Sequence, residues 1–129
     1  MEQSSELEPY SLFNDNDVFA IPPLEALQSY RVVVATCVST GIPHALGVER
    51  GHFSHIFIDE AGQATEPTAM IAIKTLADSL TNVVLAGDHC QLNPIVRSPL
   101  AREQGLKLSY LERLMNMPIY DEREGQGRT

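Results

Sequence analysis

Three continuous apolar segments constrain the fold of this chain more than any other feature of its sequence. They span residues 31–37, 55–58 and 82–86, and each is followed at once by small or polar residues. Apolar runs without alternation suit strands that are covered on both faces. Residues 66–77 carry apolar side chains at helical spacing, and Pro67 is well placed for a first helical turn. Strand, helix and strand in this order predict a parallel βαβ unit, and therefore the α/β class.

The rest of the chain divides into three parts. Residues 1–30 are expected to be a weakly ordered acidic segment, residues 31–120 the folded part, and residues 121–129 a flexible charged tail. Three further short helices are expected over residues 24–27, 98–104 and 109–115. Ser109 followed by Glu112 matches a capping box at the start of the last of these helices.

The charge distribution excludes a globally basic nucleic-acid-binding protein. The net charge is −8, and residues 1–30 hold six of the 17 acidic residues and none of the nine Lys and Arg residues. No excess of cations is therefore present to displace phosphate counterions, so nucleic-acid contacts must be local. The acidic start does not resemble a signal peptide, two cysteines form no disulfide framework, and no apolar run is long enough for a membrane span.

The strongest candidate site follows the second apolar segment. In an open parallel sheet, ligands bind beyond the carboxyl ends of the strands. Asp59 and Glu60 stand directly at such an end. One carboxylate there suits a Mg²⁺ ion that keeps most of its waters, and the next suits activation of an attacking water. Acidic residues after a buried strand are also common without any function, so this pair alone leaves both interpretations open.

A second candidate group follows the third apolar segment. Gly87 permits an unusual turn, Asp88 follows it, and Gln91 lies one short loop further on. A glutamine there suits contact with a terminal phosphate or an attacking water. A simple Gly-Asp turn with a capping glutamine is the alternative. Because one helix separates the two strand ends, the two groups are expected to share a cleft.

A third candidate group follows the first apolar segment and is called here the hydroxyl segment. It consists of Thr36, Ser39, Thr40 and Gly41. Hydroxyls and backbone N–H groups beside a glycine suit binding of nucleic-acid phosphates without net positive charge. An ordinary polar exit from a strand explains the same residues equally well.

The histidines and cysteines show no spacing typical of a metal site. Structural or surface roles are expected for all six of them: Cys37, His44, His52, His55, His89 and Cys90.

Four ordered segments resemble the motifs of superfamily 1 RNA helicases. Residues 59–67 (DEAGQATEP) resemble their Walker B segment, motif II, and residues 85–96 (LAGDHCQLNPIV) resemble motif III. Residues 34–41 resemble the nucleic-acid-contacting segment before motif II, and residues 105–115 match the stretch after motif III. The four motifs in this order make the resemblance specific.

Two further segments narrow the resemblance. Residues 52–55 (HFSH) and 117–120 (MPIY) are similar to the Armitage-like RNA helicases linked to small-RNA silencing, relatives of the nonsense-mediated-decay helicase. The match covers roughly residues 30–120. It implies part of a RecA-like P-loop NTPase domain, with a parallel sheet in a three-layer α/β/α arrangement, ATP and Mg²⁺ as ligands, RNA as partner and a cytoplasmic location. Small-RNA silencing proteins are implied as further partners.

The resemblance also implies roles for individual residues. Asp59 corresponds to the Mg²⁺ ligand and Glu60 to the catalytic base. Gln91 corresponds to the sensor of the γ-phosphate, with Gly87 and Asp88 shaping motif III. The hydroxyl segment corresponds to residues near the RNA backbone.

Two parts of the family pattern do not occur in these 129 residues. The phosphate-binding G-x-x-x-x-G-K-[ST] loop is missing, and so is the second RecA-like domain with its arginine fingers. The chain is therefore expected to correspond to the later half of a first motor domain and not to hydrolyse ATP by itself. Two other interpretations stay open: a catalytically dead module that binds RNA or protein, and a relative that acts on DNA.

Overall fold

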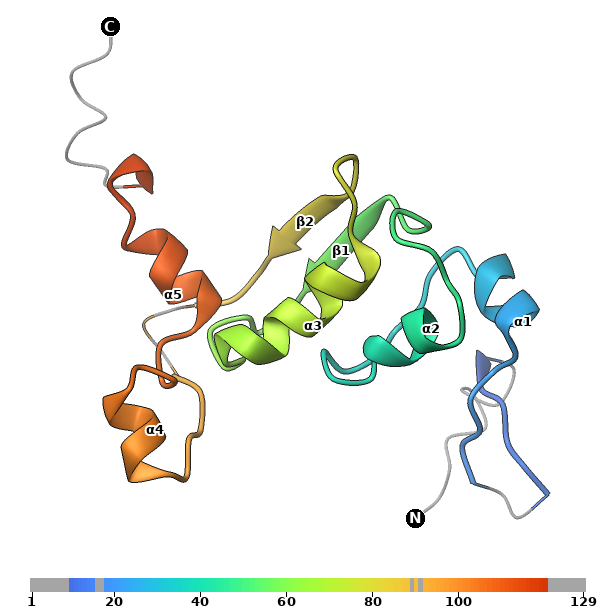
Figure 1. Cartoon of the computed structure of the whole chain (residues 1–129), viewed down its shortest axis with the longest axis horizontal. Coiled ribbons are helices and arrows are strands. Elements are labelled where there is room, and N and C mark those ends of the chain that lie inside the picture. Colours follow the sequence, from blue (N-terminus) through green and yellow to red (C-terminus); the bar gives the residue numbers. More distant parts are fainter. Residues whose placement is uncertain (1–9, 16–17, 89, 91, 121–129) are drawn as a thin grey trace, which may run out of the picture.

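The structure is a computed structural model of the chain and describes residues 10–15, 18–88, 90 and 92–120 (Figure 1). The α-helices are α1 (Leu24–Ser29), α2 (Gly41–Ala45), α3 (Glu66–Leu76), α4 (Pro99–Glu103) and α5 (Tyr110–Met115). The strands are β1 (His55–Ile58) and β2 (Asn82–Leu85), and a 3₁₀ helix, η2, spans Pro118–Tyr120.

Strands β1 and β2 pair in parallel, as the sequence predicts. Their register runs from His55 opposite Asn82 to Ile58 opposite Leu85. Helix α3 connects the two strands and packs against one face of the sheet (Figure 1). The predicted α/β class and parallel βαβ unit are therefore confirmed, and this unit is consistent with part of a RecA-like fold.

Helix α3 begins where its sequence predicts. The side chain of Thr65 caps it by accepting a hydrogen bond from the backbone N–H of Thr68 at 3.4 Å, and Pro67 lies in the first turn. Its inner face carries Ala69 and Ala72, which are buried. These two alanines belong to the central core cluster with Ile58 of β1, Ala61 and Leu111 of α5. Small alanine side chains let the helix approach the sheet closely.

The prediction of a third strand over residues 31–37 is wrong. These residues have no regular secondary structure, and Val32 and Val34 expose 78% and 93% of their surface. A groove of about 890 Å³ separates this segment from β1, and both line it. A β-branched run favours extended backbone, but a strand also needs a partner for its backbone hydrogen bonds, and this segment pairs with neither strand.

One face of the two-stranded sheet is exposed. Side chains alternate along a strand, so Ile58 points to α3 and Phe57 points away from it. Phe57 exposes 71% of its surface and its neighbour Val84 on β2 exposes 41%. The described residues therefore form two of the three predicted layers, with no helix over Phe57.

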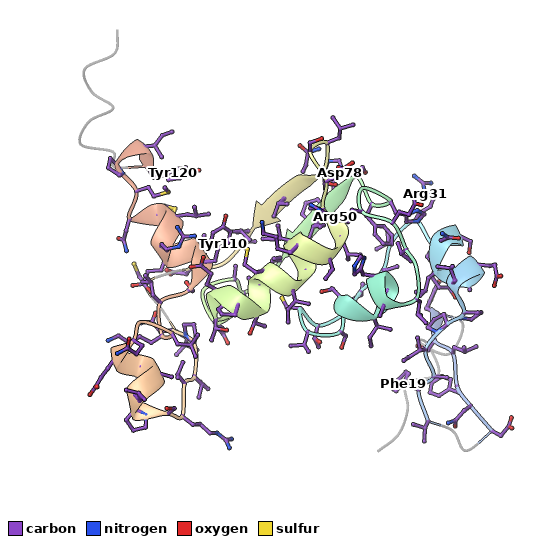
Figure 2. The ribbon with its side chains drawn as sticks, viewed as in Figure 1. Phe19, Arg31, Arg50, Asp78, Tyr110 and Tyr120 are labelled. Atoms are coloured by element: carbon purple, nitrogen blue, oxygen red, sulfur yellow. The ribbon has the colours of Figure 1, made fainter. Side chains whose placement is uncertain are left out.

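The amino-terminal end of the sheet is held by loop contacts. Arg50 Nε donates to the carbonyl of Ala77 at 2.7 Å, and Gly51 N donates to the carbonyl of Leu76 at 2.7 Å. Asp78 accepts hydrogen bonds from the backbone of Leu80 and the hydroxyl of Thr81, which lower its pKa. Arg50 and Asp78 are labelled at this end in Figure 2.

The flanking parts agree with the sequence in their local structure. Helix α1 lies where a helical turn is predicted, and Leu27 within it is buried. Helices α4 and α5 also lie where they are predicted, capped by Ser98 and Ser109. Helix α2 is an addition that the sequence pattern did not indicate. None of the helices described here is both long and apolar enough to cross a membrane. The division into segments 1–30, 31–120 and 121–129 stays a prediction.

Candidate functional site

The two predicted strand ends meet at one edge of the sheet. Beyond the last paired residues, Ala86 N donates to the carbonyl of Ile58 at 2.9 Å, and Ala61 N donates to the carbonyl of Ala86 at 2.8 Å. These bonds extend the parallel ladder past the strands and draw the two loops together. A Cβ atom built on Gly87 would lie 3.3 Å from Glu60 Cα and 3.1 Å from Ala61 N. Gly87 therefore touches the backbone of the loop that carries Asp59 and Glu60 after β1, called here the acidic loop.

Glu60 turns the chain sharply out of β1. Its φ is +50°, a left-handed conformation that is uncommon for a residue other than glycine. Such a conformation costs free energy and is concentrated at functional sites. Asp59 and Glu60 lie next to each other in sequence, and the left-handed turn takes the chain at Glu60 away from the alternation of the strand. Both carboxylates therefore stand at the carboxyl end of β1, where the chain leaves the strand.

Local hydrogen bonds hold both carboxylates. Asp59 Oδ1 accepts from the backbone N–H of Glu60 at 3.0 Å. Glu60 Oε2 accepts from the side-chain amide of Gln63 at 3.1 Å, and Gln63 N donates to the Glu60 carbonyl at 2.9 Å. Both acidic side chains are exposed to solvent. Gln63 was not singled out from the sequence, although its position three residues after Glu60 is the spacing of a turn.

The motif III loop is described in part. Gly87 has a φ of +135°, which favours glycine, and this conformation allows its close contact with the acidic loop. Asp88 Oδ1 accepts from the backbone N–H of Cys90 at 2.8 Å and so forms a tight turn. Gln91, the predicted phosphate sensor, lies outside the described residues, as does His89.

The hydroxyl segment forms a compact turn that leads into α2. Thr36 Oγ1 donates to Ser39 Oγ at 2.9 Å and accepts from Ser39 N at 3.1 Å. The hydroxyl of Thr40 donates to the carbonyl of Cys37. Gly41 begins α2, and a Cβ atom there would lie 3.5 Å from Ile71 of α3. The segment is therefore an ordered element packed on α3.

The hydroxyl segment and the acidic loop contact opposite ends of α3. The acidic loop leads into Glu66 at its first turn, whereas the hydroxyl of Thr75 in its last turn lies 3.4 Å from the carbonyl of Thr40. Nine residues of α-helix separate these positions by about 14 Å along the axis. Figure 1 shows α2 near one end of α3 and α5 beyond the other. The structure brings the two strand ends together, and Thr36 and Thr40 of the hydroxyl segment line the same groove as Asp59.

Helix α5 docks at the beginning of α3, next to the acidic loop. Thr65 and Ser109 form an antiparallel β-bridge. Ser109 is buried and its hydroxyl accepts from the backbone N–H of Glu112 at 3.0 Å. Glu66 and Arg113 form a bidentate ion pair, with both N–O distances 2.7 Å. The hydrogen bond from Arg113 lowers the pKa of Glu66, and the same bond raises the pKa of Arg113. Sequence analysis missed this pair, because 47 residues separate its members.

The described residues contain no group of three or more His, Cys, Asp and Glu side chains placed to hold a metal ion. Mg²⁺ commonly binds one or two protein carboxylates together with water and substrate phosphates. Asp59 accepts one hydrogen bond through Oδ1, and a carboxylate offers about four lone-pair sites. Its exposed carboxylate therefore fits a single-carboxylate Mg²⁺ site.

The chain matches a known protein-family model. Residues 16–99 match the AAA domain. The matched range includes the hydroxyl segment, both strands and both strand ends.

Individual proteins show the same relationship. The chain is 46% identical over 95 residues to the human protein named RNA helicase Mov10l1, which covers 74% of this chain and 8% of that protein. It is 50% identical over 102 residues to the zebrafish protein named putative helicase mov-10-B.1, and the match covers 78% of this chain and 10% of that protein. It is 42% identical over 92 residues to the Drosophila melanogaster protein named probable RNA helicase armi, and the match covers 71% of this chain and 8% of that protein.

The chain thus spans about a tenth or less of the length of these relatives. The predicted resemblance to Armitage-like superfamily 1 RNA helicases is confirmed by these matches. This chain belongs to the AAA domain family and is similar to a short segment of the proteins named RNA helicase Mov10l1 and probable RNA helicase armi.

Proposed function

We propose that this chain forms the acidic side of an ATP-hydrolysis site in an RNA helicase motor domain. The observation that carries the proposal is the contact of Gly87 with the backbone of Glu60 and Ala61 at the carboxyl edge of the parallel sheet. Ligands of open α/β sheets bind at this edge. The similarity to proteins named RNA helicases supports the same assignment.

Asp59 is the proposed ligand for Mg²⁺. It stands directly after β1 with an exposed carboxylate, and its hydrogen bond from Glu60 N fixes one oxygen. Bound Mg²⁺ supplies positive charge against the phosphates during phosphoryl transfer. Replacement of Asp59 by asparagine removes the negative charge and keeps the size of the side chain.

Glu60 is the proposed general base. Its carboxylate accepts a proton from the attacking water, and the amide of Gln63 holds one of its oxygens at 3.1 Å. The left-handed backbone at Glu60 turns the chain out of β1 directly after Asp59. Asp59 then binds the ion, and Glu60 accepts the proton of the attacking water.

The loop after β2 completes the proposed cleft. Gly87 lets this loop pass close to Glu60, and Asp88 fixes its turn through Cys90 N. Gln91 follows in this loop as the proposed contact for the γ-phosphate. A neutral amide both donates and accepts hydrogen bonds, which suits a sensor of the terminal phosphate.

The hydroxyl segment is the proposed contact for the RNA backbone. Its hydroxyls are exposed or half-buried, and the chain as a whole carries a net charge of −8. Hydroxyls and backbone N–H groups bind phosphate oxygens without a basic patch. Because α3 joins this segment to the acidic loop, it offers a rigid connection between RNA and ATP.

The test is a chimera, because these 129 residues contain no phosphate-binding G-x-x-x-x-G-K-[ST] loop. The matching segment of human RNA helicase Mov10l1 is replaced by this chain, and RNA-stimulated ATP hydrolysis is measured with Mg²⁺. We expect hydrolysis in the chimera and none by the separate chain. Loss of hydrolysis in Asp59→Asn, with retained folding, supports the assignment. Wild-type hydrolysis in that variant contradicts it.

The missing loop also favours a second candidate function for the separate chain, namely binding without turnover. RNA binding by the 129 residues in the absence of ATP, measured by fluorescence anisotropy, tests it. A DNA strand of the same sequence serves as the comparison, because motifs II and III do not distinguish RNA from DNA. Tighter binding of DNA contradicts the RNA assignment.

The cellular context belongs to the same proposal. A role in RNA silencing, with small-RNA silencing proteins as partners and the cytoplasm as location, rests on the similarity to Armitage-like helicases. Imaging of a tagged full-length protein tests the location, and co-purification with small RNAs tests the pathway.

A further inference from the structure

We propose that Glu66 and Arg113 are positioning residues that hold the acidic loop of Asp59 and Glu60 through the docking of α5. This inference rests on the proposed function. It concerns a contact outside the two strand ends, and it assigns a role to the segment after motif III.

The contact between α3 and α5 combines three interactions at one place. Thr65 and Ser109 are joined by an antiparallel bridge, and each caps the helix that follows it. Glu66 follows the cap Thr65 directly, and Arg113 lies in the last turn of α5. Oε1 and Oε2 of Glu66 accept hydrogen bonds from Nη2 and Nε of Arg113, respectively, both at 2.7 Å. The start of α3 is therefore joined to α5 at two places, the cap Ser109 and the last-turn residue Arg113.

The geometry of Arg113 is specific. Its guanidinium group lies 5.1 Å from the centre of the Tyr110 ring, a residue of the same helix labelled in Figure 2. The Tyr110 ring and the bidentate carboxylate of Glu66 together orient the planar group. A lysine at this position can keep the charge, but it cannot form the paired hydrogen bonds of the guanidinium fork.

The ion pair of Glu66 and Arg113 is connected to the acidic loop by packing as well as by sequence. Leu111 of α5 belongs to the same buried cluster as Ala61 and Ile58, which lie on either side of the Asp59–Glu60 pair. Ala61 is 1% exposed, and its N–H bonds to the carbonyl of Ala86 on the other strand end. Movement of α5 therefore changes the packing of Leu111 against Ile58 and Ala61, and with it the support of the acidic loop.

The ion pair itself is too exposed to dominate stability. Arg113 and Glu66 expose 43% and 33% of their side chains, and pairs of this kind contribute little to folding in water. The bidentate geometry instead restricts orientation. Its effect is therefore expected in the placement of Glu60 for catalysis and much less in the folded fraction.

The experiment uses the chimera described above and reads kcat and KM separately. Arg113→Glu and Glu66→Arg are each expected to lower kcat about tenfold, because small displacements of catalytic groups cost rate. KM for ATP is expected to stay within about twofold, since the pair does not belong to the proposed phosphate contacts. The double variant with both charges exchanged restores the pair and is expected to recover most of kcat. Arg113→Lys is expected to fall between wild type and Arg113→Glu.

A second measurement separates positioning from simple destabilisation. Amide hydrogen exchange of Ala61 is expected to accelerate in the single variants at a temperature where the fold is retained. Arg102→Glu, an exposed reversal in the last turn of α4, is the matched control and is expected to change neither kcat nor this exchange rate. Wild-type kcat in both single variants, or a loss of kcat that follows only the unfolding midpoint, overturns the proposal.

The proposed function and this inference fail differently. If Glu60→Gln retains hydrolysis in the chimera, the assignment of the catalytic base is wrong whatever the ion pair does. If Glu60→Gln abolishes hydrolysis while both charge reversals leave kcat and Ala61 exchange unchanged, the catalytic assignment holds and the positioning role of Glu66 and Arg113 is refuted.

Discussion

Gly87 lies against Glu60, so that a Cβ atom on Gly87 would be 3.3 Å from Glu60 Cα. The two residues are 27 positions apart in sequence, and the parallel pairing of β1 and β2 brings them together. The contact explains why the residue at position 87 must be small: its nearest neighbours are backbone atoms, which cannot move aside as a flexible side chain can.

Gly87→Ala is expected to destabilise the fold by about 1–3 kcal/mol, because alanine is strained at positive φ and its Cβ meets the backbone of the acidic loop. The measurement is urea unfolding followed by circular dichroism. Gly105→Ala is the matched control, since its φ is +89° and a Cβ there meets nothing within 4 Å. Equal losses in the two variants would show that the contact with Glu60 contributes nothing.

Glu60→Gln in the chimera is expected to lower kcat for ATP hydrolysis about a hundredfold or more, because the amide cannot accept the proton from water. ATP affinity is expected to stay unchanged, since the side chain keeps its size. Turnover assays and equilibrium binding of a labelled nucleotide measure the two quantities. Unchanged turnover would remove Glu60 from the role of base.

Ser109→Ala is expected to cost about 1–2 kcal/mol of stability, because it removes the cap of α5 at a buried position that is also bridged to Thr65. Thermal unfolding measures the change. Ser98→Ala removes the cap of the exposed helix α4 and is expected to cost less than half as much. A larger loss at Ser98 would contradict the importance of the α3–α5 contact.

The stability contributed by Glu66 is expected to fall in acid. Its hydrogen bond from Arg113 lowers the pKa of Glu66 below the value of 4.5 that it has in an unfolded chain. A carboxyl group with a lowered folded-state pKa stabilises the fold above the unfolded pKa, and this contribution disappears as the pH falls through the folded pKa. The difference in unfolding midpoint between wild type and Glu66→Gln, measured from pH 7 downward, should therefore shrink below about pH 4.5.

A pH-independent difference between these two proteins would contradict the ion pair. Asp78→Asn is the comparison, because the pKa of Asp78 is also lowered, by the N–H of Leu80 and the hydroxyl of Thr81. The stability that Asp78 contributes should also disappear as the pH falls, without any change at α5.

Thr36→Val is expected to weaken RNA binding several-fold and to leave ATP affinity unchanged, since Thr36 belongs to the proposed RNA contacts and not to the proposed phosphate contacts. The loss of the Thr36–Ser39 hydrogen bond also loosens the turn. Fluorescence anisotropy with a labelled RNA measures the effect. Thr81→Val, at the amino-terminal end of the sheet, serves as the control, and equal weakening in both variants would refute a specific RNA contact.

The local patterns of the sequence were sufficient for the elements that depend on neighbours in the chain. Residues 55–58 and 82–85 form the predicted parallel strands, and α3 begins after Thr65 with Pro67 in its first turn. Caps, prolines and helical spacing act over a few residues, so their signals can be read without knowing the fold. The meeting of the acidic loop with Gly87 followed from the βαβ topology, because parallel strands end at the same edge.

The tertiary structure decided what depends on distant partners. Val32 and Val34 have the composition of a strand, but they find no partner for the backbone hydrogen bonds that a strand requires. The pairing of Glu66 with Arg113 was equally invisible, because any carboxylate and any guanidinium group along the chain attract each other and only the packing of α5 selects these two. Local sequence determines the conformation that a segment prefers, and the free energy of burial and pairing determines which segment it meets.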